Sequence, residues 1–275
     1  TQYKAVFITA FFFCFSIYLC CFKLRYGIIL RNNNKYREKT MRIGREFFVS
    51  AVVAAAGKGT RMNMDINKQY IEVCGIPVLA RTLLVFEKCE LIDDVVVVVN
   101  NNDIFYVKQN IVEAYDLKKV KLLVAGGAQR QNSVYNGLLQ LNKETDVVVI
   151  HDGARPFIDN KIIAECIEAA LEYGVSTVAV PVKDTIKSSE DGGYVNETLE
   201  RSKLWAVQTP QAFKYDILMS AHHRAAQDGF TGTDDTVLAE RLGYKTKLVM
   251  GSYNNIKITT KEDLKFVEAI VNTLD

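Results

Sequence analysis

The sequence predicts an α/β fold with a doubly wound, mostly parallel sheet, and two patterns support this prediction. Long apolar stretches, such as residues 94–100 with five consecutive valines, are typical of strands buried on both faces. Helical patterns alternate with these stretches at a spacing of about 25 residues, which places helices on both faces of a parallel sheet. Ligands of such sheets bind at the carboxyl ends of the strands.

The individual elements follow from the same patterns. The predicted strands cover residues 48–55, 94–100, 119–124, 146–150, 175–182 and 246–250. The predicted helices cover residues 77–89, 103–115, 129–141, 159–173, 214–228, 233–242 and 260–273, and Asp159 is the expected N-cap of the helix at 159–173. The sequence contains no internal repeat and indicates no second core, so we expect one domain over residues 48–275.

Residues 183–207 break the alternation of strands and helices. This segment is polar and rich in β-formers, has a turn at Asp191-Gly192-Gly193 and lacks a helical pattern. It predicts a hairpin that projects from the sheet as an arm. Because a hairpin buries little surface by itself, we expect the arm to pack on a second copy of the chain in a homodimer.

Charge and cysteine content exclude several classes of protein. The net charge of +2 conceals an asymmetry, because residues 1–47 hold nine Lys and Arg but two acidic residues, and the remainder is mildly acidic. The body therefore lacks the basic stripe of a nucleic-acid-binding protein. Its cysteines, Cys74, Cys89 and Cys166, are too widely spaced for a disulfide framework or a zinc site, and we expect them to be reduced.

The first 47 residues form a leader that differs from the body. Residues 5–22 carry no formal charge, a length at the lower edge of what spans a bilayer, and basic residues follow them. The chain starts at Thr1 and its first methionine is Met41, so we expect residues 1–40 to be translated upstream sequence. The alternative is a real membrane anchor. Under either interpretation we expect a cytoplasmic body.

A glycine-containing loop follows the first predicted strand. Its sequence is AAAGKGTRM over residues 54–62, and Lys68-Gln69-Tyr70 comes shortly after it. Glycines let backbone N–H groups approach a phosphate, and Arg61 and Lys68 add positive charge. The loop matches neither of the common glycine-rich phosphate motifs, so the prediction rests on the preceding strand and on these two cations.

Two further loops follow later strands. Residues 126–133 place two glycines before a helix, which favours an anion or the edge of a base. Residues 151–156 read His-Asp-Gly-Ala-Arg-Pro, and Asp152 at the end of a buried strand requires a metal or a cation. The alternative for Asp152 is a structural pair with Arg155. We interpret His151 as a structural histidine and residues 232–235 as a helix cap.

Together these motifs resemble the 2-C-methyl-D-erythritol 4-phosphate cytidylyltransferase family of the non-mevalonate isoprenoid pathway. The resemblance covers residues 48–273 and rests on AAAGKGTRM, NKQY, GGAQRQNSV, HDGARP, VKDTIK, LWAVQTPQ and NIKITT in the family's order. It implies a Rossmann-like nucleotidyltransferase sheet with a dimerisation arm. It also implies a reaction in which CTP and a sugar-alcohol phosphate give a CDP-linked product and pyrophosphate, with Mg²⁺ as cofactor.

The resemblance implies roles for individual residues. The expected catalytic residues are Arg61, Lys68, Arg201 and Lys257. The expected nucleotide-binding residues are Ala55, Ala56, Gly57, Gly59, Gly127, Arg130, Ser133 and Gly153. The expected acceptor-binding residues are Arg155, Thr185 and Thr209, and Asp152 is the expected Mg²⁺ ligand. In the family the arm crosses to the other subunit, so Arg201 is expected to serve the partner's site.

Two alternatives remain beside this interpretation. A ribitol-5-phosphate cytidylyltransferase would share the fold, the CTP site and the metal, but its loop reads GG-T-G-T-R-M where this chain has AAGKGTRM. A membrane-tethered, catalytically silent binding module would use the leader as its anchor. The sequence also departs from the family at Ala128 and Asn254, positions where acidic residues can occur, and Asn254 removes a candidate second carboxylate for the metal.

Overall fold

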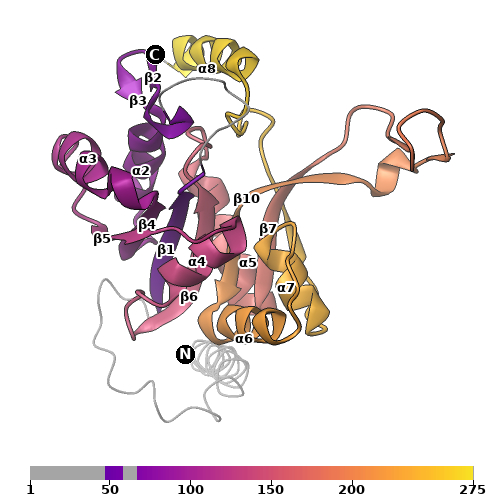
Figure 1. Ribbon diagram of the computed structural model, residues 1–275, viewed down its shortest axis with the longest axis horizontal. Coiled ribbons are helices and arrows are strands. Elements are labelled where there is room, and N and C mark those ends of the chain that lie inside the picture. Colours follow the sequence, from indigo (N-terminus) through magenta and orange to yellow (C-terminus); the bar gives the residue numbers. More distant parts are fainter. Residues whose placement is uncertain (1–46, 58–66, 275) are drawn as a thin grey trace, which may run out of the picture. The chain divides into compact units, whose positions relative to one another are not determined.

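A seven-stranded sheet forms the centre of the protein in a computed structural model that describes residues 47–57 and 67–274 (Figure 1). Its strand order is β11-β7-β10-β6-β1-β4-β5. The strands are β1 (Phe48–Ala55), β4 (Asp94–Val99), β5 (Val120–Ala125), β6 (Thr145–Asp152), β7 (Val175–Pro181), β10 (Trp205–Lys214) and β11 (Lys247–Met250). All neighbouring pairs are parallel except those of β10, which runs antiparallel to β6 and β7. The predicted doubly wound, mostly parallel sheet is confirmed.

The inner strands are apolar throughout because both of their faces are covered. On β1 and β4, Val53 and Val97 point into one core, and Val52 and Val98 point into the other. Successive side chains of a strand point to opposite faces, so a strand between two helical layers needs an apolar residue at every position. This explains the valine run that identified β4 in the sequence.

The helices form two layers over this sheet. Apolar side chains of α2 (Val78–Lys88) and α5 (Asn160–Tyr173) pack in the first core, and those of α4 (Arg130–Leu138), α6 (Tyr215–Gln227) and α7 (Asp235–Arg241) pack in the second. The terminal helix α8 (Lys261–Leu274) packs near the short hairpin of β2 (Glu72–Val73) and β3 (Ile76–Pro77). The predicted N-cap is confirmed, since the side chain of Asp159 accepts a hydrogen bond from the Lys161 amide.

Two regions differ from the sequence-based expectation. The strand β10 was not predicted, because its buried Gln208, Thr209 and Gln211 break the apolar pattern that identified the other strands. The helix predicted at residues 103–115 is present but irregular. It begins as the 3-10 turn η5 (Asn101–Asp103), continues as α3 (Ile104–Val107) and ends as the π-helical segment η6 (Lys108–Glu113).

The segment between β7 and β10 forms a projecting arm (Figure 1). It contains the antiparallel pair β8 (Lys187–Ser188) and β9 (Glu197–Thr198), followed by the 3-10 turn η7 (Arg201–Lys203). Tyr194 and Val195 connect the two short strands with 83% and 56% of their surface exposed. The arm therefore exposes apolar side chains that no described part of the same chain covers.

The leader lies outside the described residues. Among the helices that the structure describes, none is both long and apolar enough to cross a bilayer. Of the three cysteines of the body, Cys89 and Cys166 are buried and Cys74 is exposed. Burial raises the pKa of Cys166 to about 12, which makes its thiol unreactive and agrees with the structural role expected for it.

Candidate active site

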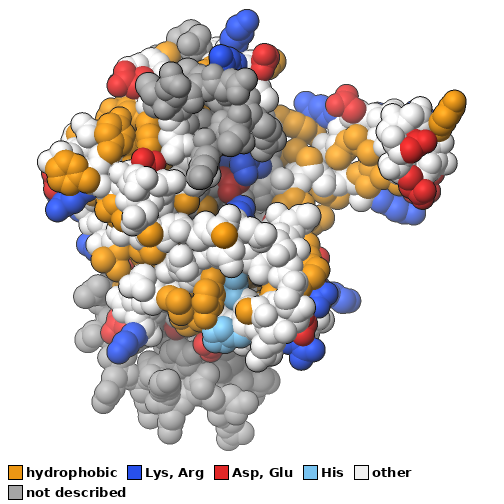
Figure 2. Space-filling view, in the orientation of Figure 1, with side chains coloured by type: hydrophobic (Ala, Val, Ile, Leu, Met, Phe, Trp, Pro, Cys, Tyr) orange, Lys and Arg blue, Asp and Glu red, His pale blue; other side chains and the backbone are white. Residues whose placement is uncertain are grey.

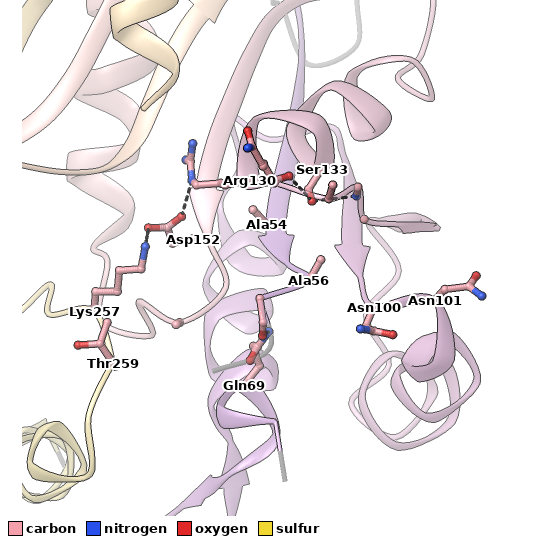
Figure 3. Close-up of a pocket in the computed structure, with 16 residues that line it drawn as sticks. Ala54, Ala56, Gln69, Asn100, Asn101, Arg130, Ser133, Asp152, Lys257 and Thr259 are labelled. Carbon is pink, nitrogen blue, oxygen red and sulfur yellow. Dashed lines mark hydrogen bonds and ion pairs between the residues drawn. The ribbon is translucent and has the colours of Figure 1, made fainter. Parts of the chain in front are cut away.

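A cleft opens at the carboxyl ends of β1, β4 and β6 (Figure 3). After β1 the chain first adds β4 and β5 on one side, and then returns to place β6 on the other side of β1. Such a change of direction leaves a crevice between the two crossover connections, and ligands of α/β sheets bind there. The cleft has a volume of about 490 Å³. Its described lining consists of Ala54, Ala56, Gly57, Gln69, Asn100, Asn101, Gly126, Gly127, Ala128, Gln129, Arg130, Ser133, Asp152, Ala154, Lys257 and Thr259.

Asp152 lies at one end of this cleft among three cationic side chains. Its Oδ2 is 2.7 Å from Lys257 Nζ and 3.7 Å from Arg155 Nε, and its Oδ1 is 3.3 Å from Arg130 Nε. Figure 3 shows Arg130 and Lys257 approaching the carboxylate from opposite sides. The three cations come from three different segments of the chain, and only the fold brings them together.

The electrostatics of this cluster keep Asp152 ionised. Burial by itself disfavours the charged carboxylate and raises its pKa, but Arg130, Lys257 and Arg155 outweigh that effect. The pKa of Asp152 therefore lies well below its usual range. With three cations around one anion the cluster carries excess positive charge, which suits a polyphosphate ligand.

Asp152 is held in place by a buried chain of hydrogen bonds through His151. The Asp152 amide donates to Thr209 Oγ1 over 3.0 Å, and that hydroxyl lies 3.1 Å from His151 Nδ1. His151 Nε2 lies 3.1 Å from the Arg155 carbonyl, which can only accept, so the proton resides on Nε2. Burial lowers the pKa of His151 to about 4, and the ring is neutral at physiological pH. His151 thus has the structural role that we expected for it.

Lys257 points toward Asp152 because residues on both sides of it are anchored. The fully buried Asn255 donates from Nδ2 to the Thr209 carbonyl over 2.9 Å and to Gln208 Oε1 over 3.1 Å. On the other side, Ile258 is buried in the third core and its amide donates to the Ala154 carbonyl over 2.9 Å. The side chain of Lys257 between them is 35% exposed, so it can reach a ligand in the cleft.

Arg155 and Thr209 support the cluster from outside the cleft. Arg155 Nη1 donates to the Asn255 carbonyl over 2.7 Å, which ties the segment of Lys257 to the end of β6. Neither Arg155 nor Thr209 is among the described residues that line the cleft. Within a single copy of the chain, these two expected acceptor-binding residues hold neighbouring residues of the cluster in position.

The first glycine loop is only partly described. Arg61 and Gly59 lie outside the described residues, and so does the side chain of Lys68. The side chains of Ala54 and Ala56 line the cleft, whereas Ala55 is buried in the first core. A Cβ at Gly57 would meet no atom of the described residues within 4 Å, which leaves space beside its backbone in this part of the structure. Small residues therefore leave room for a ligand at the end of β1.

The NKQY motif is anchored at each of its three neutral residues. Gln69 Nε2 donates to the carbonyl of Ala55 and, over 3.1 Å, to that of Gly57. Asn67 Nδ2 and Tyr70 Oη donate to the same oxygen of Asp103, over 2.9 Å and 3.0 Å. The backbone of Lys68 is therefore fixed on both sides, beside the end of β1.

The second glycine loop leads into α4. A Cβ at Gly127 would lie 2.5 Å from Asn132 Cβ, so only glycine allows this close approach. Ser133 Oγ accepts a hydrogen bond from the Gly127 amide and donates to the Gln129 carbonyl, both over 3.0 Å. Ser133 thus holds the loop closed, and Arg130 in the first turn of α4 extends beside Asp152.

Gly153 has a packing explanation of its own. A Cβ there would lie 3.0 Å from Ala55 Cβ and 3.0 Å from Leu79 Cδ1, between β1 and α2. Gly153 is buried and is not among the described residues that line the cleft. Any contribution to nucleotide binding would therefore act through the position of Asp152.

Two expected site residues lie on the arm. Arg201 and Thr185 are exposed, and neither is among the described residues that line the cleft of their own chain. Arg201 Nη1 donates to the Lys183 carbonyl over 3.0 Å, which holds it at the base of the arm.

Among the described residues, the cleft offers a divalent cation one protein carboxylate. Asp152 is the one acidic side chain among the described lining residues, and no group of three His, Cys, Asp or Glu side chains is found in the described part of the chain. Asn254 is exposed and outside the described lining of the cleft. One carboxylate together with substrate phosphates is a usual Mg²⁺ environment, so these residues fit a cation that arrives with a triphosphate.

Several residues of the cleft were not predicted from the sequence. Asn100 and Asn101 follow the valine strand β4, and a polar run at the carboxyl end of a buried strand could have indicated them. Gln69 could have been taken from the NKQY motif. Asp103 had no such signal, because its two partners lie more than 30 residues away in the sequence.

Comparison with known proteins places these features in a family. The model of the 2-C-methyl-D-erythritol 4-phosphate cytidylyltransferase family matches residues 49–273. Proteins of that name from Pelotomaculum thermopropionicum and Alkaliphilus metalliredigens are 49% and 50% identical to this chain. The matches cover 81% and 82% of this chain, and 94% and 93% of those proteins.

Solved structures agree with the sequence relatives. A 4-diphosphocytidyl-2C-methyl-D-erythritol synthase from Anaerococcus prevotii superimposes with a TM-score of 0.73 at 34% identity, over 82% of this chain and 96% of that one. The 2-C-methyl-D-erythritol 4-phosphate cytidylyltransferase from Thermus thermophilus gives a TM-score of 0.67 at 31% identity, over 82% of this chain and all of that one. The similarity spans the sheet and the cleft-forming segments, and leaves the leader unmatched.

Proposed function

This chain belongs to the 2-C-methyl-D-erythritol 4-phosphate cytidylyltransferase family, and from that premise we propose how its cleft works. The enzyme transfers a cytidylyl group from CTP to 2-C-methyl-D-erythritol 4-phosphate. The products are 4-diphosphocytidyl-2-C-methyl-D-erythritol and pyrophosphate, in isoprenoid precursor biosynthesis. The observation that carries the mechanism is the ion cluster of Asp152 with Arg130, Arg155 and Lys257 at the carboxyl edge of the sheet.

The nucleotide occupies the side of the cleft formed by the two glycine loops. Small residues at Ala54, Ala56 and Gly57 let backbone groups approach the ligand. Arg130 and the expected cations Arg61 and Lys68 neutralise the triphosphate. Ser133 and Gly127 hold the second loop in the shape that accepts the base and ribose.

The reaction needs positioning and charge neutralisation rather than a covalent enzyme intermediate. An oxygen of the acceptor phosphate attacks the α-phosphorus of CTP, the bond to the β-phosphate oxygen breaks, and pyrophosphate leaves on the opposite side. Both reactants are anions, so cations on both sides of the reacting phosphorus lower the barrier. Lys257, which has 35% of its side chain exposed beside Asp152, binds the acceptor phosphate in this mechanism.

The enzyme depends on Mg²⁺ under this proposal. Asp152 would hold the cation together with oxygens of CTP, because it is the one carboxylate of the described lining. A bound Mg²⁺ supplies charge neutralisation at the phosphates. The surrounding Arg130 and Arg155 keep Asp152 ionised and oriented for this role.

The functional unit is a homodimer in which the arm completes the partner's site. Arg201 and Thr185 are exposed on the arm and lie outside the described lining of their own cleft. Tyr194 and Val195 on the arm, and Val207 at the start of β10, expose apolar surface, and Figure 2 shows hydrophobic side chains along the arm. Burial of this surface against a second copy would carry Arg201 toward the acceptor phosphate of that copy.

We place the catalytic domain in the cytoplasm. Its cysteines Cys74 and Cys166 are free thiols, as is usual in a reducing compartment. Fractionation of cells that express the full chain tests this placement, since recovery of the chain with the membrane fraction would contradict it.

Pyrophosphate release from CTP tests the central proposal. Turnover is expected with 2-C-methyl-D-erythritol 4-phosphate and Mg²⁺, loss of turnover on chelation, and recovery when Mg²⁺ is restored. Ribitol 5-phosphate is the matched acceptor control, because it is also a sugar-alcohol phosphate. Turnover with ribitol 5-phosphate alone would overturn the acceptor assignment.

Mixed dimers test the shared site. Arg201→Ala and Lys68→Ala chains are each expected to be inactive alone. When the two are mixed, about a quarter to a half of the wild-type rate should return, since a mixed dimer retains one site with both residues intact. Inactivity of the mixed dimers would show that Arg201 does not act in the partner's site.

A further inference from the structure

A second buried aspartate contacts the same arginine as Asp152. Asp235, at the start of α7, is 1% exposed, and its Oδ2 accepts a hydrogen bond from Arg130 Nη1 over 2.6 Å. Its other oxygen lies 3.4 Å from Nε2 of the buried His222. Asp235 is not among the described residues that line the cleft. It therefore reaches the candidate active site only through Arg130.

The neighbouring Asp234 shows that Asp235 is more than part of a helix cap. Asp234 is the residue that caps α7, since its Oδ1 accepts from the Val237 amide over 3.0 Å. Asp234 also accepts from Gln211 Nε2 over 2.8 Å and has no contact with Arg130. Asp234 therefore caps the helix, whereas Asp235 binds Arg130. The expected helix cap at residues 232–235 accounts for Asp234 but not for Asp235.

The rest of the segment before α7 also attaches to the nucleotide loop. The Gly232 amide donates to Gln131 Oε1 over 2.9 Å, and Gln131 Nε2 donates to the Phe230 carbonyl over 3.1 Å. Thr231 Oγ1 donates to Gln129 Oε1 over 3.2 Å. Gln129, Arg130 and Gln131 are consecutive residues at the start of α4, and the segment 230–235 holds all three.

The charges around Arg130 explain what this attachment does. Arg130 has a long side chain that is 30% exposed, and Asp152 attracts its guanidinium toward the floor of the cleft. Asp235 binds the other end of the guanidinium from the interior. The guanidinium is therefore held between two carboxylates. A side chain held in its bound geometry before the ligand arrives loses less conformational freedom when it binds.

We propose that Asp235 is a positioning residue that holds Arg130 in the orientation in which it binds the phosphates of CTP. This role rests on the proposed function of the cleft. It assigns Asp235, which is not among the described residues that line the cleft, to the nucleotide half of the site. The ionised state of Asp235 agrees with this role, because Arg130 and His222 outweigh the effect of burial and lower the pKa of the carboxyl.

Steady-state kinetics of Asp235→Asn test the proposal, because asparagine keeps the shape and removes the charge. The KM for CTP is expected to rise about tenfold, as befits loss of a charged hydrogen-bond partner, while kcat changes less than about threefold. The KM for the acceptor should stay within about twofold, because Arg130 belongs to the nucleotide half. An unchanged KM for CTP would overturn the role of Asp235.

A double-mutant cycle separates positioning from a general structural effect. In an Arg130→Lys background the change Asp235→Asn should add less than about twofold to the KM for CTP, since the fork that Asp235 orients is already absent. A full tenfold rise in that background would show that Asp235 acts by another route.

Asp234→Asn is the matched control. It removes the adjacent carboxylate and should lower Tm, but leave the KM for CTP within about twofold. An equal rise in that control would also overturn the proposal.

A second variant at Asp235 and the activity of the wild-type chain complete the test. If Asp235→Asn does not fold, Asp235→Glu keeps the charge but displaces the guanidinium by one carbon–carbon bond, and its KM for CTP should still rise several-fold. A wild-type KM in that variant would overturn the proposal. Absence of pyrophosphate release by the wild-type chain with either acceptor would instead contradict the proposed function. The two failures are therefore distinguishable.

Discussion

Asp152 and Asp235 are both buried, both ionised and both bound to Arg130, yet they lie in different surroundings. Asp152 faces a cleft, and its partners Lys257 and Arg130 are partly exposed to ligand. Asp235 faces the interior, with Arg130 on one oxygen and the buried His222 near the other.

The difference teaches what decides the use of a buried carboxylate. Under the proposed function, Lys257 and Arg130 can exchange Asp152 for phosphate oxygens, so the ion pairs of Asp152 prepare the site for substrate. Asp235 and His222 are buried and are not among the described residues that line the cleft, so the bond from Asp235 keeps Arg130 in place when that exchange occurs. Substitutions at the two positions should consequently separate activity from stability.

The largest expected effect is on activity at Asp152. Asp152→Asn should lower kcat/KM by roughly three orders of magnitude, because the substitution removes the expected metal ligand and the charge that orders the cations. Tm should fall by only a few degrees, since asparagine keeps the size and one acceptor oxygen. Pyrophosphate release and calorimetry measure the two effects. If Asp152→Asn kept its activity but lost much of its Tm, Asp152 would act on stability, as is expected for Asp235, and the proposed contrast would be wrong.

The next effect is on stability at Asp235. Asp235→Ala should lower the free energy of unfolding by about 3 kcal/mol, because it removes one partner from a buried pair and leaves Nη1 of Arg130 without its carboxylate acceptor. Urea denaturation followed by circular dichroism measures this loss. Asp228→Ala is a suitable control, since its pairs with Arg224 and Arg241 lie on the surface, and a much smaller loss is expected there.

Lys257 lies on the cleft side of Asp152, so its substitution should affect activity more than stability. Lys257→Met keeps the length of the side chain and removes its charge, and kcat/KM for the acceptor should fall about a hundredfold. The free energy of unfolding should change little, because the lysine is partly exposed. Lys261→Met, at an exposed position at the start of α8, provides the control and should leave kcat/KM within about twofold. Equal losses in both variants would remove Lys257 from the mechanism.

The smallest expected effect is the pH dependence of the Asp235 contribution. The folded-state pKa of Asp235 lies below its usual value, so its ionised form stabilises the fold above about pH 4. That stabilisation is lost as the pH falls through the lowered pKa. The difference in Tm between the wild type and Asp235→Asn should therefore narrow from pH 5 to pH 3. A difference that stays constant over this range would contradict an ionised Asp235.

The sequence predicted most of the elements that lie in the layers of the sheet. Parallel strands such as β4 and helices such as α5 are marked by residues that are near one another in the chain, through unbroken apolar runs, helical periodicity and an N-cap. The strand β10 has no such mark. Its buried Gln208, Thr209 and Gln211 are stabilised by partners elsewhere in the fold, such as Asn255 and Thr177.

The site divides in the same way. Loops with glycines and charges indicated residues of the cleft such as Asp152, and the family resemblance added Lys257, although only the fold shows that these two side chains lie 2.7 Å apart. His151 was interpreted correctly as structural, because a buried histidine beside a strand end is usually hydrogen-bonded. The family resemblance, and no local pattern, raised Arg201 and Thr185 to candidates.

The sequence by itself determined the class of fold, the edge of the sheet where ligands bind and the family to which the chain belongs. All three depend on residue types and spacings within short segments. Only the tertiary structure decided that Arg130 is held between Asp152 and Asp235, which lie 22 and 105 residues away from it. Contacts over such separations leave no periodicity in the sequence, because the packing of the helices on the sheet, and not the local chain, brings these charges together.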